Sequence, residues 1–174
     1  VFDMLDPRNR RGMQDCMIWF KQGSTDAHGS FVPDGRVRWY YTSGMLSREE
    51  AYRAGVEHGT WRWWDPQGDL RSETQYADGQ LHGLEKFWWP RTIRHTTWTH
   101  GQRSGRFWET TYEGALVCEV ELLDGRPNSP LVRYHPIGVK YATATWDAEG
   151  KCTIVYHQPQ EPGVHVVPWR LFDG

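Results

Sequence analysis

The sequence predicts an all-β protein: an elongated, twisted antiparallel meander of about five β-hairpins, with irregular terminal caps. Three observations support this fold class: a repeat with a period of 24 residues, glycine and proline at turn positions, and an unusual composition. The 174 residues include 11 Trp, 8 Tyr, 6 Phe and 18 Gly, although only 38% are hydrophobic and the mean hydropathy is −0.75. So many aromatic residues exclude a disordered chain and favour short strands joined by tight turns.

The period is clearest between Gly59 and Gly83, which open successive repeats 24 residues apart. Within this repeat the recurring marks are two aromatic residues, a turn glycine, an aliphatic residue, an aromatic residue and a last glycine: Trp61, Trp64, Gly68, Leu70, Tyr76 and Gly79. The same classes recur on both sides, which predicts a repeat array. We expect five repeats, at residues 35–58, 59–82, 83–104, 105–128 and 129–150, the third having lost two residues near its turn at 90–92.

Each repeat is expected to form a β-hairpin. In the repeat at 59–82, residues 60–64 and 70–76 form the strands, and the Asp-Pro-Gln-Gly sequence at 65–68 matches a type I turn. If no bulge interrupts the alternation, one face of the sheet holds Trp61, Trp63, Leu70 and Tyr76. The opposite face then holds Tyr40, Trp64, Trp88 and Tyr134. We therefore expect a thin sheet with an aromatic spine in place of an aliphatic core.

Two segments lie outside the repeats, residues 1–34 and 151–174. We expect them to be an N-terminal and a C-terminal cap or arm, because repeat arrays need atypical ends that cover their terminal strands. Residues 13–20 are expected to form a strand or a short helix, and residues 152–156 a strand. Caps that pack on the array and arms that dock on a partner are both compatible with the sequence.

The repeat resembles the MORN repeat, and most closely the variant found in bacterial YwqK-family antitoxin proteins. The resemblance covers residues 35–150 and is carried by Gly59, Trp61, Trp64, Gly68, Leu70, Tyr76, Gly79 and Gly83 and their equivalents in the other repeats. It implies a scaffold or binding protein, because members of this family are associated with protein assembly, membrane-associated scaffolds and toxin neutralisation. A repeat architecture specifies the fold much more closely than the function.

The charge balance limits the class of partner. Lys and Arg number 20 and Asp and Glu 22, for a net charge of −2. Nucleic-acid binding needs a basic excess, so we expect no nucleic-acid partner. Membrane lipid is allowed by the resemblance but disfavoured, because the chain has no polybasic cluster. Arg far outnumbers Lys, as in many protein-binding surfaces, although a biased genome composition would give the same excess.

No motif for nucleophilic, phosphate-binding or zinc-dependent catalysis is present. We therefore expect no enzyme activity, no catalytic residue, no metal and no cofactor. His58 and His82 each precede a repeat-opening glycine, a place where Asp, Ser and Asn also occur, so they are expected to be turn residues. Three glutamates share another repeat position, mid-strand and with arginines nearby, and are expected to belong to a ladder of exposed cross-strand ion pairs: Glu49, Glu73 and Glu119, near Arg48, Arg71 and Arg94.

The number and spacing of the cysteines limit the disulfides and zinc sites that the chain could form. Their number, 3, is odd, and none forms a C-x-x-C pair. This pattern argues against a disulfide framework and against a cysteine-based zinc site. No apolar stretch approaches the roughly 20 residues that span a bilayer. We expect an intracellular, cytoplasmic location.

The aromatic columns are the best candidates for a binding surface, because exposed rings flanked by arginine are typical interface anchors. The candidate partner-binding residues are Tyr40, Trp61, Arg62, Trp63, Trp64, Arg71 and Trp88. Each ring could instead serve only to pack the sheet. We expect a non-catalytic module that binds another protein, in its most concrete form a toxin or effector neutralised by occlusion. The alternative is a structural subunit of a viral particle or of a cytoskeletal or membrane-associated complex. The oligomeric state and the face that binds remain open.

Overall fold

The computed structural model describes residues 16–157 and 165–167, which contain strands and turns and no helix. Its contacts divide the chain into an N-terminal unit, Val1–Phe87, and a C-terminal unit, Trp88–Gly174. Neighbouring strands in each sheet pair antiparallel and follow one another along the chain, apart from the two-residue strands β4 and β11, so the predicted all-β meander is confirmed. Because the described residues contain no helix, they contain none that could cross a membrane.

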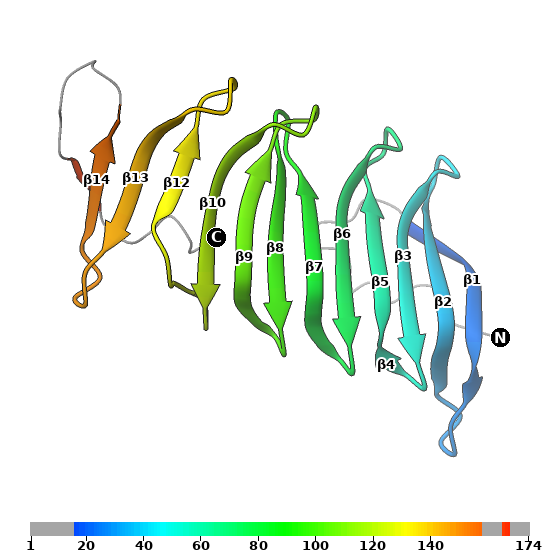
Figure 1. The fold of residues 1–174 in the computed structure, drawn as a ribbon. Helices are drawn as coiled ribbons and strands as arrows, with labels where there is room; N and C mark the ends of the chain where they lie inside the picture. The colour runs from blue at the N-terminus through cyan, green and yellow to red at the C-terminus, as the bar shows by residue number, and fades with distance from the viewer. Residues whose placement is uncertain (1–15, 158–164, 168–174) are drawn as a thin grey trace. The chain divides into compact units, whose positions relative to one another are not determined.

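The sheet of the N-terminal unit has the order β1-β2-β3-β5-β6-β7, with β4 paired to β3 (Figure 1). Its strands are β1 (Cys16–Thr25), β2 (Phe31–Tyr41), β3 (Leu46–Arg53), β4 (Val56–Glu57), β5 (Gly59–Trp64), β6 (Leu70–Ala77) and β7 (Gln80–Trp88). Strand β1 extends the meander into the segment at 1–34 that was expected to be a cap or arm, and residues 1–15 of that segment lie outside the described residues.

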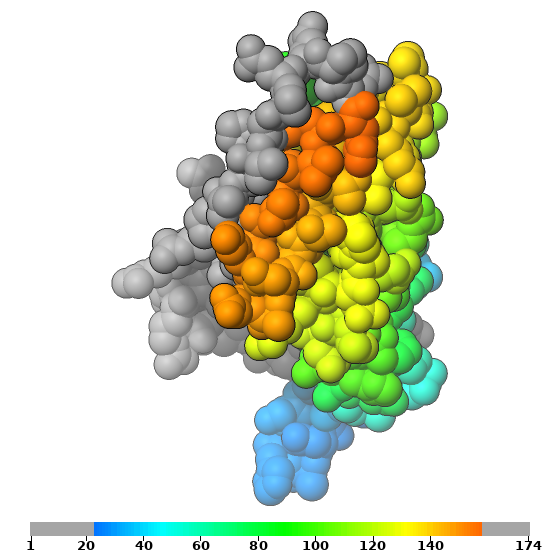
Figure 2. All heavy atoms as spheres, turned by 60° about the vertical axis from the view of Figure 1, so that its left-hand side comes forward, coloured from blue at the N-terminus to red at the C-terminus, as the bar shows by residue number. Residues whose placement is uncertain are grey.

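The sheet of the C-terminal unit has the order β8-β9-β10-β12-β13-β14-β15, with β11 paired to β10. Its strands are β8 (Ile93–Thr99), β9 (Gln102–Thr110), β10 (Leu116–Leu123), β11 (Arg126–Pro127), β12 (Leu131–Tyr134), β13 (Lys140–Trp146), β14 (Cys152–Tyr156) and β15 (His165–Val167). Strands β12, β13 and β14 lie side by side in Figure 2. Strand β14 coincides with the run at 152–156 that was expected to be extended.

One turn geometry recurs at the hairpin ends. In the turn after β5, the N–H of Asp65 donates to the carbonyl of Asp69 at 3.0 Å, and the N–H of Gly68 donates to the carbonyl of Asp65 at 2.9 Å. Gly68 has a φ of +88°, which suits a residue without a Cβ. Matching pairs of bonds close the turns Tyr41–Met45, Thr111–Ala115, His135–Val139 and Asp147–Lys151. The turn after β7 is shorter, because the N–H of Trp89 donates to the carbonyl of Thr92 at 2.9 Å.

Bulges next to these turns correct the predicted faces. Trp63 pairs with Ser72 but Trp64 pairs with Leu70, so Arg71 is an extra residue in β6. The bulge interrupts the alternation of side chains near the turn. Leu70 therefore does not share the face of Trp61 and Trp63, contrary to the prediction from the sequence. Away from the turn the prediction is correct, because Tyr76, Trp61 and Trp63 occupy alternate positions of one paired register.

The two units bury different kinds of side chain. The C-terminal unit has a core of aliphatic and thiol side chains, with Phe107, Trp146 and Ile154 packed against it: Cys118, Val120, Leu122, Leu131, Ala144 and Cys152. The expectation of an aromatic spine in place of an aliphatic core is therefore wrong for this unit. In the described part of the N-terminal unit, Val37 is the buried hydrophobic residue, and the other buried residues are polar: Ser47, Glu49, Glu50 and Asp65.

The glycines that open the repeats have a backbone conformation that a side chain would disturb. Gly59 has a φ of +96°, and a Cβ there would lie 3.3 Å from the Cβ of Ala51. Gly44, in a turn, has a φ of +83°, and a Cβ there would meet nothing within 4 Å. We expect Gly59→Ala to lower the free energy of unfolding by about 2 kcal/mol and Gly44→Ala by about 1 kcal/mol. Urea denaturation of both variants measures the difference, and equal losses would contradict it.

Candidate functional site

One face of the N-terminal sheet carries a row of aromatic rings, which we call the aromatic face; its rings are Trp39, Tyr52, Trp61, Trp63 and Tyr76. Trp61 lies between the two tyrosines, with ring centroids 5.4 Å from Tyr52 and 4.7 Å from Tyr76. Its indole N–H donates to the carbonyl of Ala51 at 3.0 Å. All five rings are half-buried, so they pack the sheet and still present part of their surface.

The aromatic face also contains an ion pair between a half-buried arginine and a buried glutamate. Trp39, Arg48 and Trp63 are directly paired across β2, β3 and β5, and the guanidinium of Arg48 lies 5.3 Å from the centroid of the Trp39 ring. Arg48 contacts the carboxylate of Glu50 at 3.1 Å, and the hydroxyl of Tyr52 donates to that carboxylate at 2.9 Å. Burial, with the charge of Glu50 beside it, raises the pKa of Tyr52. The carboxylate of Glu50 therefore has two partners on this face, whereas the buried indole N–H of Trp39 has no hydrogen-bond partner among the described residues.

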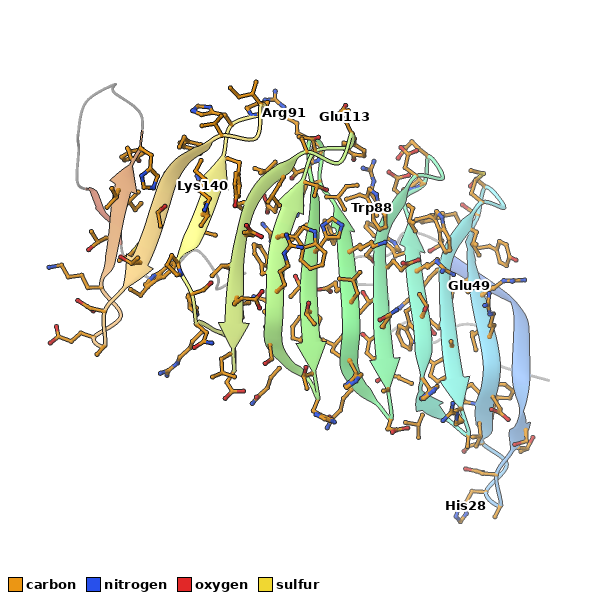
Figure 3. All side chains as sticks on the ribbon, in the orientation of Figure 1. His28, Glu49, Trp88, Arg91, Glu113 and Lys140 are labelled. Atoms are coloured by element: carbon orange, nitrogen blue, oxygen red, sulfur yellow. The ribbon has the colours of Figure 1, made fainter. Side chains whose placement is uncertain are left out.

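The opposite face carries a series of cross-strand ion pairs, which we call the arginine ladder; it runs through Arg36, Arg38, Glu49, Arg62 and Glu73. Glu49 accepts hydrogen bonds from Arg36 at 2.9 Å and from Arg38 at 2.7 Å, and Arg62 lies 3.5 Å from it. Arg62 also donates to Glu73 at 2.8 Å. Glu49 lies on β3 within this series (Figure 3).

The ladder corrects the expectation for the glutamates. The expected cross-strand pairing is present, but the partners are not the arginines nearby in the sequence. The side chain of Glu49 is also buried rather than exposed, at only 7%. Arg48 and Arg71 pair elsewhere, with Glu50 and Asp65. The hydrogen bond and charge of Glu49 raise the pKa of Arg38. The ladder joins three arginines to two glutamates, so it has an excess positive charge.

Trp64, the last residue of β5, and Arg71, in β6, flank the turn between these strands. The Nε of Arg71 donates to the carboxylate of Asp65 at 2.6 Å, and the N–H groups of Gln67 and Asp69 donate to the same carboxylate. Burial alone would raise the pKa of Asp65, but these hydrogen bonds lower it. The carbonyl of Trp64 accepts a hydrogen bond from the hydroxyl of Tyr41 at 2.7 Å. Because the carboxylate of Asp65 binds both Arg71 and the N–H groups of the turn, Arg71 stabilises the turn.

The structure groups some of the predicted site residues and separates others. Trp61 and Trp63 lie on the aromatic face, whereas Arg62 lies in the arginine ladder. Tyr40 pairs with Leu46 at the turn end of β2, and Trp88 is the last residue of β7 (Figure 3). All seven predicted residues are half-buried: Tyr40, Trp61, Arg62, Trp63, Trp64, Arg71 and Trp88.

The C-terminal unit has a comparable polar cluster around Glu119. The hydroxyl of Tyr134 donates to Glu119 at 2.6 Å, and Arg106 donates to it at 2.8 Å. The guanidinium of Arg106 lies 4.8 Å from the ring centroid of Trp108, which stacks on His95 with an interplanar angle of 3°. The hydrogen bond from Tyr134, together with Arg106, lowers the pKa of Glu119, and the same bond raises the pKa of Tyr134 to about 12.

Sequence reasoning missed a hollow beside the shortened turn that follows β7. The hollow has a volume of about 430 Å³ and is lined by Trp89, Pro90, Arg91, Thr92, Arg94 and Glu109. Trp89 is 44% exposed. The sequence did contain a signal of this site, because the third repeat is short at residues 90–92, but a missing residue does not reveal which side chains line the space.

Two further observations concern metal and thiol chemistry. Within residues 16–157 and 165–167, no cluster of three or more His, Cys, Asp or Glu side chains could hold a metal ion. Cys118 and Cys152 are buried free thiols. Burial raises the pKa of Cys118 to about 11, which makes this thiol a poor nucleophile at neutral pH.

The fold and its surfaces define a class of antiparallel hairpin-repeat proteins in which neighbouring hairpins stabilise each other. A family model described as a MORN repeat variant matches residues 33–54 and 57–78. These segments include most of β2 and β3, and of β5 and β6. They are thus similar to MORN repeats, which are generally modules that bind proteins or membranes. Comparison with curated proteins gave no match.

The buried carboxylate of Glu49 generates a stability prediction. We expect Glu49→Gln to lower the free energy of unfolding by about 2 kcal/mol, because it leaves three arginines without their shared anion. The arginines are partly exposed, which keeps the loss below that of a fully buried pair. Urea denaturation is the measurement. Glu57→Gln is the control, since Glu57 forms no ion pair among the described residues, and an equal loss there would contradict the role of the ladder.

The Tyr134–Glu119 hydrogen bond generates a pH prediction. Because the pKa of Glu119 is lowered in the folded state, its contribution is present above the unfolded pKa and lost as the pH falls through the folded value. We expect Tyr134→Phe to cost about 1 kcal/mol at pH 7, with a difference from wild type that shrinks as the pH falls below about 4. Unfolding measured across this range tests it. A difference independent of pH would contradict it.

Proposed function

We propose that this chain is a non-catalytic protein-interaction module that presents the aromatic face to a protein partner. The observation that carries the proposal is the half-buried row of Trp39, Tyr52, Trp61, Trp63 and Tyr76. Tryptophan, tyrosine and arginine are the side chains that most often dominate binding energy. The similarity of residues 33–54 and 57–78 to MORN repeats supports the same class of function.

The fixed positions of these side chains favour binding. Trp61 is held by ring contacts on both sides and by its bond to Ala51, and Arg48 is held by Glu50 and Trp39. A surface whose rotamers are already fixed loses little conformational entropy when a partner binds. On the opposite face, the arginine ladder adds charged groups that would select partners of matching charge.

The more specific form of the proposal is neutralisation of a partner toxin or effector inside the cell by occlusion of its surface. A broad sheet face suits occlusion, because it can cover an area of a partner without entering its active site. The resemblance of residues 35–150 to antitoxin-type MORN repeats favours this form. Buried free thiols at Cys118 and Cys152 are compatible with a reducing compartment.

A structural role in a larger assembly is the second candidate, and one observation favours it. The C-terminal unit exposes large apolar side chains on the turn after β12 and on β14, with Ile137 81% exposed and Val155 49% exposed. Strand β14, which bears Val155, is coloured orange at the front of Figure 2. Exposed apolar surface of this kind is typical of contacts with other subunits.

Variants of the two surfaces separate these functions. Proteins encoded next to this chain would be co-expressed with it and tested for complex formation and for relief of toxicity. We expect Trp63→Ala to weaken a complex at least tenfold, while Ile137→Ser leaves it intact. Urea denaturation confirms that each variant is folded. If Ile137→Ser abolishes the complex and Trp63→Ala does not, the structural role is favoured. If neither affects it, the aromatic face is not the binding surface.

A further inference from the structure

The hollow in the C-terminal unit arises beside a turn that differs from the others. The turn Trp89–Thr92 is shorter than Thr111–Ala115, the turn between β9 and β10, and it lacks the glycine found there. The hydroxyl of Tyr112 donates to the carbonyl of Trp89 at 2.8 Å, so the two turns are joined side by side. The shorter turn leaves open space over Arg94 and Glu109, which line the hollow from β8 and β9.

Three charged residues line the hollow, and two of them form an ion pair with each other. The Nε of Arg94 donates to Glu109 at 3.0 Å, and its guanidinium lies 5.3 Å from the ring centroid of Trp89. Arg94 is thus neutralised and held against the tryptophan. Arg91 is exposed at the turn (Figure 3), and among the described residues it forms no ion pair. The hollow therefore combines a fixed aromatic wall with one uncompensated positive charge.

We propose that this hollow binds an acidic segment of a protein partner, with a carboxylate on Arg91 and an adjacent apolar side chain against Trp89 and Pro90. The guanidinium fork of Arg91 matches a carboxylate in a bidentate geometry. Trp89 supplies apolar area that is already exposed and positioned. This inference rests on the proposed function, since it specifies the chemistry of a partner for a protein-interaction module.

Charge and size favour a carboxylate over a more highly charged ligand. A phosphate polymer or an anionic membrane would need several uncompensated cations, and the hollow has one. The neighbouring turn carries Glu113, an exposed carboxylate whose pKa is lowered by its hydrogen bond with Thr111, so it remains negative. Its negative charge opposes a dense anionic surface more strongly than a single carboxylate, because repulsion grows with the number of charges.

The test uses the full chain and fluorescence anisotropy of a labelled synthetic peptide of alternating Glu and Leu. A Gln/Leu peptide of equal length tests the charge, and vesicles rich in phosphatidylserine test a membrane. Arg91→Ala and Trp89→Ala remove the two recognition elements. The matched controls are Arg126→Ala, an exposed arginine without an ion pair among the described residues, and Ile137→Ala, an exposed apolar residue on another turn.

We expect the Glu/Leu peptide to bind at least tenfold more tightly than the Gln/Leu peptide. Each hollow variant should weaken binding about tenfold, and each control should leave it unchanged. Equal binding of the two peptides, or an unaffected Arg91→Ala variant, would overturn the proposal. So would vesicle binding that depends on Arg91 without binding of the peptide.

The experiments can contradict the proposed role of the aromatic face and the proposed role of the hollow independently of each other. If a co-expressed partner binds through Trp63 but the Glu/Leu peptide does not bind, the interaction module stands and the hollow is excluded. If the peptide binds through Arg91 but no partner depends on the aromatic face, the hollow stands and the role of the aromatic face is excluded.

Discussion

The pairing of buried carboxylates with arginine is the constraint on which the N-terminal unit depends. A single sheet with little aliphatic material cannot exclude water by hydrophobic burial alone. This unit instead buries Glu49 and Glu50, and each has an arginine within ion-pair distance. A buried carboxylate without a partner would cost several kcal/mol, so the pairs strongly favour the native strand register. A slip by one residue would move each glutamate away from its arginine.

The C-terminal unit is stabilised by a hydrophobic core instead of buried ion pairs. Val120 and Leu122 point into a core closed by Phe107 and Trp146, so hydrophobic burial stabilises this sheet and its ion pairs lie nearer the surface. The backbone pattern is nevertheless shared, because the period depends on turn geometry rather than on the kind of core. One hairpin design therefore supports two chemically different interiors.

The sequence predicted the strands and turns well because glycine at positive φ marks them at a fixed spacing. Gly59 and Gly68 both have this conformation, and no packing information is needed to find them. The partners of Glu49 were not predictable, because the bulges beside the turns after β2 and β5 shift the register and set which arginine lies opposite. The hollow was not predictable either, since it depends on how Trp89 and Arg94 pack in space.

Two tyrosine hydroxyls show how neighbouring hairpins are coupled. Tyr41 bonds to the carbonyl of Trp64, and Tyr112 bonds to the carbonyl of Trp89, each reaching a turn in the adjacent hairpin. A hairpin end cannot fray without leaving the carbonyl of its neighbour unpaired. Local opening at these ends is therefore shared by two hairpins, and amide hydrogens of joined turns should exchange with solvent at a common rate. At these two places the unit that opens is expected to be a pair of hairpins, although the sequence period is one hairpin long.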